Sequence, residues 1–81
     1  MENIMECSIC FEKYNQKDRV PRVLLCGHTF CTSCLKKMKE MTNEDKIKCP
    51  LDKKLGFKTN NIEKIPINWL MIDLLDLNNN I

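Results

Sequence analysis

The spacing of the cysteines constrains this chain more than any other feature of its sequence. All six cysteines and the single histidine fall within residues 7–49. Cys7 and Cys10 form one Cys-x-x-Cys pair, and Cys31 and Cys34 form a second. Because both sulfurs of such a pair can bind one tetrahedral ion, the spacing predicts at least one metal site.

The length of the chain makes a stabilising metal plausible on physical grounds. A domain of 81 residues buries little apolar surface, and domains of this size often depend on disulfides or metal ions. The N-terminus carries neither the basic nor the apolar region of a signal peptide, and segment 65–77 is too short and too polar to cross a bilayer. We therefore expect a cytoplasmic or nuclear protein whose cysteines bind metal rather than form disulfides, with no membrane partner.

The remaining candidate ligands complete a set of eight. Cys26 and His28 flank a glycine that permits a tight turn, and Cys49 is followed three residues later by Asp52. With Asp52 counted, the ligands fill two closed tetrahedral sites; without it, one site would keep a water. A carboxylate oxygen binds zinc at about 2.0–2.2 Å, against about 2.3 Å for sulfur. The alternative is that Asp52 only shapes a turn.

The sequence divides into three parts. Residues 1–6 form a short N-terminal flank, residues 7–53 hold every cysteine and the histidine, and residues 54–81 form a C-terminal flank that becomes apolar. A helix is expected at 32–41 with Thr32 as its N-cap, and another at about 68–77 with Asn68 as its N-cap. Short strands are expected at 23–25 and 29–30.

The ordered series of ligands resembles the RING finger family. The stretch "CGHTFCTSC" followed by "CP" is specific for it, and the resemblance covers about residues 7–53. PHD fingers place their His further along and carry a Trp before the last Cys pair, which this chain lacks. The resemblance implies a small zinc-stabilised α+β fold, a cross-braced RING finger with a central helix, a short β-hairpin and a C-terminal flanking helix. It also implies two Zn²⁺ ions, the first held by Cys7, Cys10, Cys31 and Cys34, and the second by Cys26, His28, Cys49 and Asp52.

Asp52 departs from the commonest RING pattern, which ends in Cys. Some RING families end in Asp, and this chain is most similar to Roquin-type RING domains, since it shares with them a "CP-apolar-Asp" ending and the later "IPIN" at 65–68. The resemblance therefore implies a C3HC3D variant in which Asp52 replaces a thiolate ligand.

The family resemblance also implies a function. RING domains typically act as E3 ubiquitin ligases, which bind a ubiquitin-charged E2 and promote transfer of ubiquitin to a substrate lysine without a covalent intermediate. The cation that bridges E2 and ubiquitin in this family, commonly Arg, corresponds here to Lys53. The positions that match the family's E2-facing groove are Ile9, Met38, Pro50 and Leu51.

Several alternatives to this function and to these residue roles were considered. The domain could be a non-catalytic interaction or dimerisation module, and Ile9 and Met38 could complete the core instead of binding E2. Nucleic-acid binding is disfavoured, because the formal charge of +2 falls to about zero once two zinc ions bind six thiolates. The apolar residues of the second helix could pack on the RING or form a homodimer; they are Trp69, Leu70, Ile72 and Leu74. The expected core consists of Leu24, Leu25, Phe30, Leu35 and Ile47.

Overall fold

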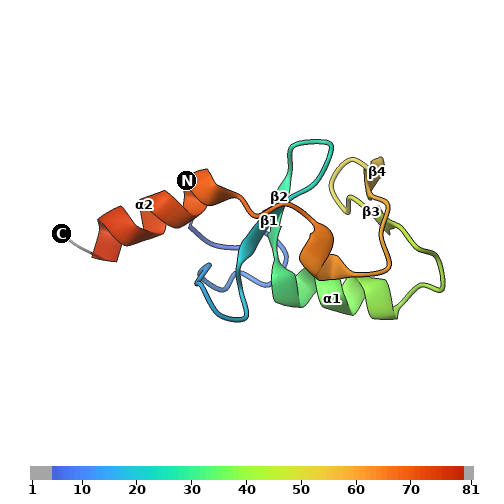
Figure 1. Cartoon of the computed structure of the whole chain (residues 1–81), viewed down its shortest axis with the longest axis horizontal. Coiled ribbons are helices and arrows are strands. Elements are labelled where there is room, and N and C mark those ends of the chain that lie inside the picture. Colours follow the sequence, from blue (N-terminus) through green and yellow to red (C-terminus); the bar gives the residue numbers. More distant parts are fainter. Residues whose placement is uncertain (1–4, 80–81) are drawn as a thin grey trace.

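Two short hairpins, a central helix and a projecting C-terminal helix make up the computed structural model, which describes residues 5–79, the side chains of 78 and 79 excepted (Figure 1). The molecule is elongated, with extents of 43 × 25 × 18 Å. This is the small α+β architecture expected from the sequence. The elements in chain order are β1 (Pro21–Val23), β2 (Thr29–Cys31), α1 (Thr32–Glu40), β3 (Ile47–Lys48), β4 (Leu55–Phe57), the 3₁₀ turn η1 (Ile62–Lys64) and α2 (Trp69–Asn79).

The first hairpin pairs β1 with β2 in antiparallel register. Its turn is closed by hydrogen bonds from the Leu24 N–H to the His28 carbonyl (2.9 Å) and from the Gly27 N–H to the Leu24 carbonyl (2.9 Å). Gly27 has φ +94°, which only glycine adopts without strain. The expected strand at 23–25 is therefore wrong by two residues, because residues 24–28 form the turn.

Leu25 corrects the expected core. Its backbone N–H donates to the Gly56 carbonyl at 2.7 Å, which fixes the main chain of the turn against the second hairpin. Its side chain is 70% exposed, whereas Leu24 beside it is 2% exposed. The turn directs one leucine inward and the other outward, and composition alone does not distinguish them.

Helix α1 begins where expected, but its cap is a different residue. Cys31 is the N-cap, and its sulfur accepts from the Cys34 N–H at 3.4 Å. Thr32 is the first helical residue, and its hydroxyl donates to the Val20 carbonyl at 2.9 Å. The helix ends at Glu40, one residue earlier than expected, and Met41, which is 87% exposed, is its C-cap. A thiolate at the N-terminus of a helix is favoured by the helix dipole, so this cap also suits a metal ligand.

The second hairpin, β3 with β4, was not expected from the sequence, because its strands are too short to show a pattern. Its β4 strand packs tightly on the first hairpin: a Cβ added at Gly56 would lie 2.8 Å from Cδ1 of Leu24 and 3.0 Å from the Ile47 carbonyl oxygen. The close approach of the two hairpins therefore requires glycine at this position.

A small core lies between α1, the hairpins and η1. The largest fully buried side chains include Phe30, Leu35, Ile47 and Ile65. Several cysteines lie in the same cluster, so the core is continuous with the ligand-bearing loops. The core expected from the sequence is confirmed at Leu24, Phe30, Leu35 and Ile47.

The C-terminal flank docks along β1 before α2 begins. The Val23 N–H donates to the Pro66 carbonyl (2.9 Å), and the Asn68 N–H donates to the Pro21 carbonyl (2.8 Å). Between them lies Arg22, which is only 8% exposed. Its guanidinium donates to the carbonyls of Ile65 (2.8 Å) and Glu63 (3.1 Å), and its Nε to the Thr32 hydroxyl (2.8 Å).

Helix α2 starts with the expected cap, because the Asn68 side chain accepts from the Met71 N–H at 3.1 Å. It then extends away from the rest of the domain (Figure 1). Ile72 is 7% exposed and packs inward, while Trp69 and Leu70 are 65% and 71% exposed. Packing on the rest of the domain is therefore confirmed for Ile72 and wrong for Trp69 and Leu70, while Leu74 is half-buried. Among residues 5–79, no helix has the length and apolarity needed to cross a membrane.

Candidate metal centres

Two groups of four potential metal ligands are brought together in the described part of the chain. Within each group, the ligand atoms all lie within 4.8 Å of one another. The first group is Cys7, Cys10, Cys31 and Cys34, and the second is Cys26, His28, Cys49 and Asp52. Pairs consecutive in sequence alternate between the groups, which is the arrangement of a cross-brace.

The sulfur spacing in the first group fits a tetrahedral zinc site. Sγ of Cys7 lies 3.8 Å from Sγ of Cys34, and Sγ of Cys10 lies 3.8 Å from Sγ of Cys31. Two sulfurs bound to one tetrahedral Zn²⁺ at about 2.3 Å are separated by about 3.8 Å. These two sulfur pairs therefore have the separation that a shared ion imposes, and they are far outside the S–S distance of a disulfide.

The second group has the geometry of a mixed site centred on the histidine. Nδ1 of His28 lies 3.3 Å from Sγ of Cys49, 3.5 Å from Sγ of Cys26 and 3.2 Å from Oδ2 of Asp52. For shorter Zn–N and Zn–O bonds, tetrahedral separations shrink to about 3.3–3.6 Å. These contacts therefore fit four ligands of one ion, with Nδ1 as the histidine ligand atom.

The two zinc knuckles have the same backbone structure. In the first, the Cys7 N–H donates to the Glu12 carbonyl (2.9 Å), and the Phe11 N–H donates to the Cys7 carbonyl (2.8 Å). In the second, the Cys49 N–H donates to the Lys54 carbonyl (2.8 Å), and the Lys53 N–H donates to the Cys49 carbonyl (2.9 Å).

The correspondence extends to the residue after each knuckle. Phe11 and Lys53 have φ of 61° and 63°, and they are the non-glycine residues with positive φ in the described part of the chain. Asp52 thus stands in the second knuckle where Cys10 stands in the first.

The carboxylate of Asp52 has two separate partners. Oδ1 accepts from the Lys54 N–H at 2.9 Å, and Oδ2 faces His28. The Lys54 N–H lowers the pKa of Asp52 more than burial raises it. Asp52 therefore shapes the turn with one oxygen and leaves the other, as an anion, at the ligand position, so the two interpretations drawn from the sequence are compatible.

The first site is more enclosed than the second. Cys7 and Cys31 are fully buried, whereas the side chains of His28 and Asp52 are 41% and 24% exposed. Burial raises the pKa of Cys7, but backbone N–H groups, with that of Cys31 foremost, outweigh it and bring this pKa down to about 7. Burial raises the pKa of Cys31 to about 11. Because zinc binds thiolates, loading the first site displaces protons that burial would otherwise retain.

Comparison with known proteins identifies the class. Residues 7–50 match the RING-type zinc-finger family. The chain is 35% identical over 69 residues to E3 ubiquitin-protein ligase KEG of Arabidopsis thaliana, and 39% identical over 74 residues to E3 ubiquitin-protein ligase SH3RF2 of Homo sapiens. It is 26% identical over 76 residues to human E3 ubiquitin-protein ligase TRIM32.

This chain belongs to the RING-type zinc-finger family, and its two clusters fit the two zinc sites of a RING finger. The three alignments cover 85%, 91% and 94% of the chain but only 4%, 9% and 11% of the relatives. The likeness therefore concerns one domain of much longer proteins.

The residues predicted from the resemblance to line an E2-facing groove are all partly accessible. Ile9 and Leu51 occupy the same position in the two knuckles and are 39% and 58% exposed. Pro50 is half-buried. Met38 is half-buried against the core cluster and also lines a pocket.

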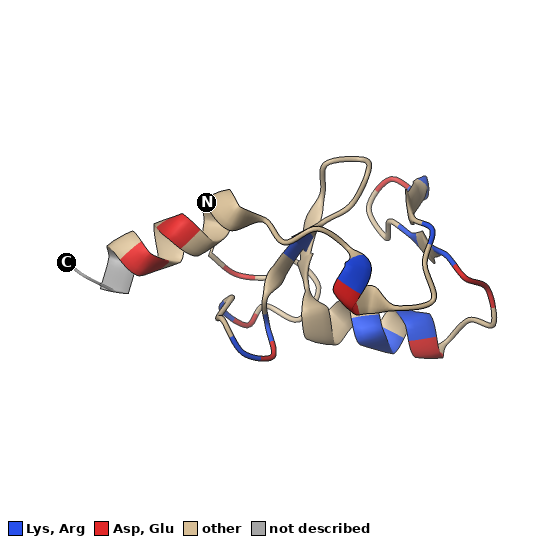
Figure 2. Cartoon of the chain, viewed as in Figure 1, with Lys and Arg blue, Asp and Glu red and all other residues tan. Residues whose placement is uncertain are grey.

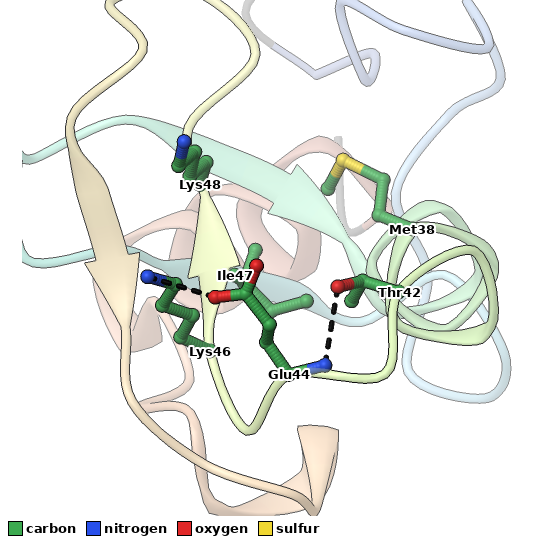
Figure 3. A pocket seen from close by; sticks show the side chains of 6 residues that line it. All are labelled: Met38, Thr42, Glu44, Lys46, Ile47 and Lys48. Carbon is green, nitrogen blue, oxygen red and sulfur yellow. Dashed lines mark hydrogen bonds and ion pairs between the residues drawn. The ribbon is translucent and has the colours of Figure 1, made fainter.

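That pocket, of about 240 Å³, lies between the end of α1 and β3 (Figure 3). Its floor is Ile47, and its rim carries the Glu44–Lys46 ion pair at 2.8 Å. Of the predicted groove residues, only Met38 lines it. The pocket therefore adjoins the predicted groove without coinciding with it.

Charges are unevenly distributed over the surface. Lys36 and Lys37 are exposed on α1, and further lysines lie around β3 and β4, while α2 carries only acidic charges (Figure 2). Acidic residues are interspersed among these lysines, so they form no uniform basic face.

Proposed function

We propose that this domain is the RING module of an E3 ubiquitin-protein ligase, which binds a ubiquitin-charged E2 and promotes transfer to a substrate lysine. The observation that carries the proposal is the cross-braced pair of ligand clusters in a chain whose relatives are named E3 ubiquitin-protein ligases. Because this chain covers only a small share of each relative's length, we assign substrate recruitment to regions outside these residues.

We assign all eight clustered residues as zinc ligands, with Asp52 completing the second site. This makes the domain a C3HC3D RING, most like the Roquin type. Both sites are closed, so they offer no position for an activated water, and the role of zinc is structural. Zinc would hold the two knuckles at a fixed separation, and the chain's own surface would do the binding.

The proposed mechanism is positioning. Ile9, Met38, Pro50 and Leu51 contact the E2, and Lys53 contacts E2 and ubiquitin together. Restricting a flexible conjugate to a reactive geometry accelerates attack by the acceptor lysine, and no nucleophile from the RING takes part. Exposure of Lys53 directly after the second knuckle supports this role, because its ammonium is accessible to both partners. Lys keeps the charge of the commoner Arg but lacks its planar fork.

A titration of the ¹⁵N-labelled, zinc-loaded domain with a panel of E2 enzymes tests the proposal. We expect the amide shifts of both knuckles and of the α1 segment around Met38 to move with at least one E2. Ile9→Ala is expected to weaken that binding, and Leu25→Ala, which truncates a more exposed apolar side chain on the turn of the first hairpin, is the control. Shifts confined to α2, or none with any E2, would contradict it.

A second candidate is a non-catalytic dimerisation module, favoured by the outer side of α2. Leu70 and Leu77 are 71% and 61% exposed, and Leu74 lies between them at helical spacing. A homodimer through this side is compatible with ligase activity or could replace it. Sedimentation of the domain and of Leu70→Asp distinguishes a monomer from a dimer, and a dimer that discharges no E2 would favour the second candidate. We place the protein in the cytoplasm or nucleus, where free thiols persist for zinc.

A further inference from the structure

A buried hydrogen-bond donor on Arg19 has no acceptor. Among the described residues, the Nε–H of Arg19 is the one buried side-chain polar group without a hydrogen-bond partner. Another part of the same guanidinium is paired, because Nη1 donates to Oδ2 of Asp18 at 3.1 Å. A buried N–H without an acceptor costs stability, so each such group in a native structure requires a physical explanation.

The segment that carries Arg19 is held beside the first metal centre. The carbonyls of the preceding and following residues accept from the hydroxyls of Ser33 (2.8 Å) and Thr32 (2.9 Å). Ser33 and Thr32 lie between two ligands of the first group, Cys31 and Cys34. Hydrogen bonds on both sides of Arg19 therefore fix its backbone against the loop of the second cysteine pair.

The side chain of Arg19 is directed towards a third ligand of this group, Cys10. Burial lowers the pKa of Arg19, but the carboxylates of Asp18 and Glu12 and the Cys10 side chain, acting as acceptor and as anion, raise this pKa by more. The sulfur of Cys10 lies 3.8 Å from that of Cys31. The guanidinium therefore has a carboxylate on one side and a ligand sulfur within reach of its remaining donors.

The donor set of the first group favours a cation at this place. Four thiolates exceed the charge of one Zn²⁺ by two, whereas the second group, with two thiolates, one carboxylate and a neutral imidazole, exceeds it by one. The first group is also the more enclosed, so water screens its excess negative charge less. N–H donors from outside the ligand set stabilise such ligands and raise metal affinity.

We infer that Arg19 is an outer-sphere partner of the first zinc site, with its Nε–H donating to the Cys10 thiolate and its charge offsetting that of the four sulfurs. Arg19 is a positioning residue and binds no metal itself. Asp18 orients the guanidinium by holding Nη1. The inference rests on the proposed assignment of the first group as zinc ligands, and it is independent of E2 binding.

The test uses Arg19→Met, which keeps most of the aliphatic stem and removes the charge and the donors. We expect the affinity of the first site for zinc to fall by about 10–100-fold in competition with a chelator, with the ions counted by native mass spectrometry. Arg19→Lys keeps the charge without Nε–H, so its affinity should lie between those of Arg19→Met and the parent. Lys17→Met removes an exposed cation from the same loop and is the matched control, which should retain both ions like the parent.

Cadmium-113 NMR of the cadmium-loaded domain identifies the affected site, because cadmium bound to four sulfurs resonates apart from cadmium bound to a mixed donor set. We expect Arg19→Met to shift the four-sulfur signal and to leave the other in place. This signature separates an effect on the ligand sulfurs from a general loss of stability, which would weaken both sites together.

Several outcomes would overturn the inference. They are parent-like zinc retention in Arg19→Met, equal weakening of the two sites, or an equal effect of Lys17→Met. If Arg19→Met does not fold with excess zinc, Arg19→Lys decides, and parent-like affinity in that variant would exclude the Nε–H contact. If the parent holds no ion on the four cysteines, the ligand assignment fails and the inference fails with it.

Discussion

Oδ2 of Asp52 lies 3.2 Å from Nδ1 of His28, with both atoms beside two cysteine sulfurs. In a solvated surface pair, this distance would be an ordinary hydrogen bond of little consequence. Here it is close to the separation of two ligands on one tetrahedral ion, and the knuckle that carries Asp52 repeats the hydrogen bonds of the all-cysteine knuckle. In the proposed assignment, Asp52 closes the second site in place of a seventh cysteine.

Asp52→Ala should leave one zinc tightly bound and weaken the other. Structural zinc binds peptides with about 10–16 kcal/mol, so one ligand of four contributes about 3 kcal/mol, or about a hundredfold in affinity. Asp52→Cys should retain both ions. Native mass spectrometry against a competing chelator measures this, and two ions held by Asp52→Ala as tightly as by the parent would remove Asp52 from the ligand set.

Removal of zinc should unfold the domain. The core is small, and buried cysteines form part of it. We expect a strong chelator to abolish the dispersion of amide resonances and most of the circular-dichroism signal, and stoichiometric zinc to restore both. A chelated domain that kept its dispersion would show that the apolar core suffices alone.

Arg22→Met should destabilise the zinc-loaded domain by about 2–4 kcal/mol, because three hydrogen bonds are lost and buried carbonyls of the C-terminal flank are left unpaired. Thermal unfolding measures the effect. The control is Lys36→Met, since Lys36 also reaches residue 63, but by an exposed ion pair at 3.9 Å. That substitution should change stability by less than about 0.5 kcal/mol. Equal effects at the two positions would mean that the flank is not held by Arg22.

Lys53→Arg should accelerate ubiquitin discharge, because a planar guanidinium can bridge two partners with several hydrogen bonds. Single-turnover rates with a fixed E2 measure the effect, and Lys54→Arg, at the next exposed position, is the matched control. An unchanged rate for Lys53→Arg would count against the bridging role.

Sequence and structure agree best where a ligand or cap fixes the chain. The helix beginning at Thr32 was predicted from its apolar spacing, although Cys31 and not Thr32 caps it, and the helix beginning at Trp69 was predicted from the Asn68 cap. The eight candidate ligands followed from spacing and from resemblance to one family.

Features that depend on tertiary contacts were not predictable. The β3–β4 hairpin is too short to show periodicity, and the opposite orientations of Leu24 and Leu25 are set by the contact between two hairpins. The buried role of Arg22 could not be predicted from the sequence, because a charged residue in a short strand is usually solvated. In the structure, Arg22 instead donates to carbonyls that lie 41 and 43 residues away in sequence. The shared positive φ of Phe11 and Lys53 follows from the knuckle hydrogen bonds and gives no signal in the sequence.

The most direct test of the account is discharge of ubiquitin-charged E2 enzymes to free lysine, with the domain confirmed to hold two zinc ions. We expect faster discharge with at least one E2, and loss of that acceleration in zinc-loaded Ile9→Ala but not in Leu25→Ala. No acceleration with any E2 would contradict a ligase module and leave the dimerisation candidate, with α2 as the surface to investigate.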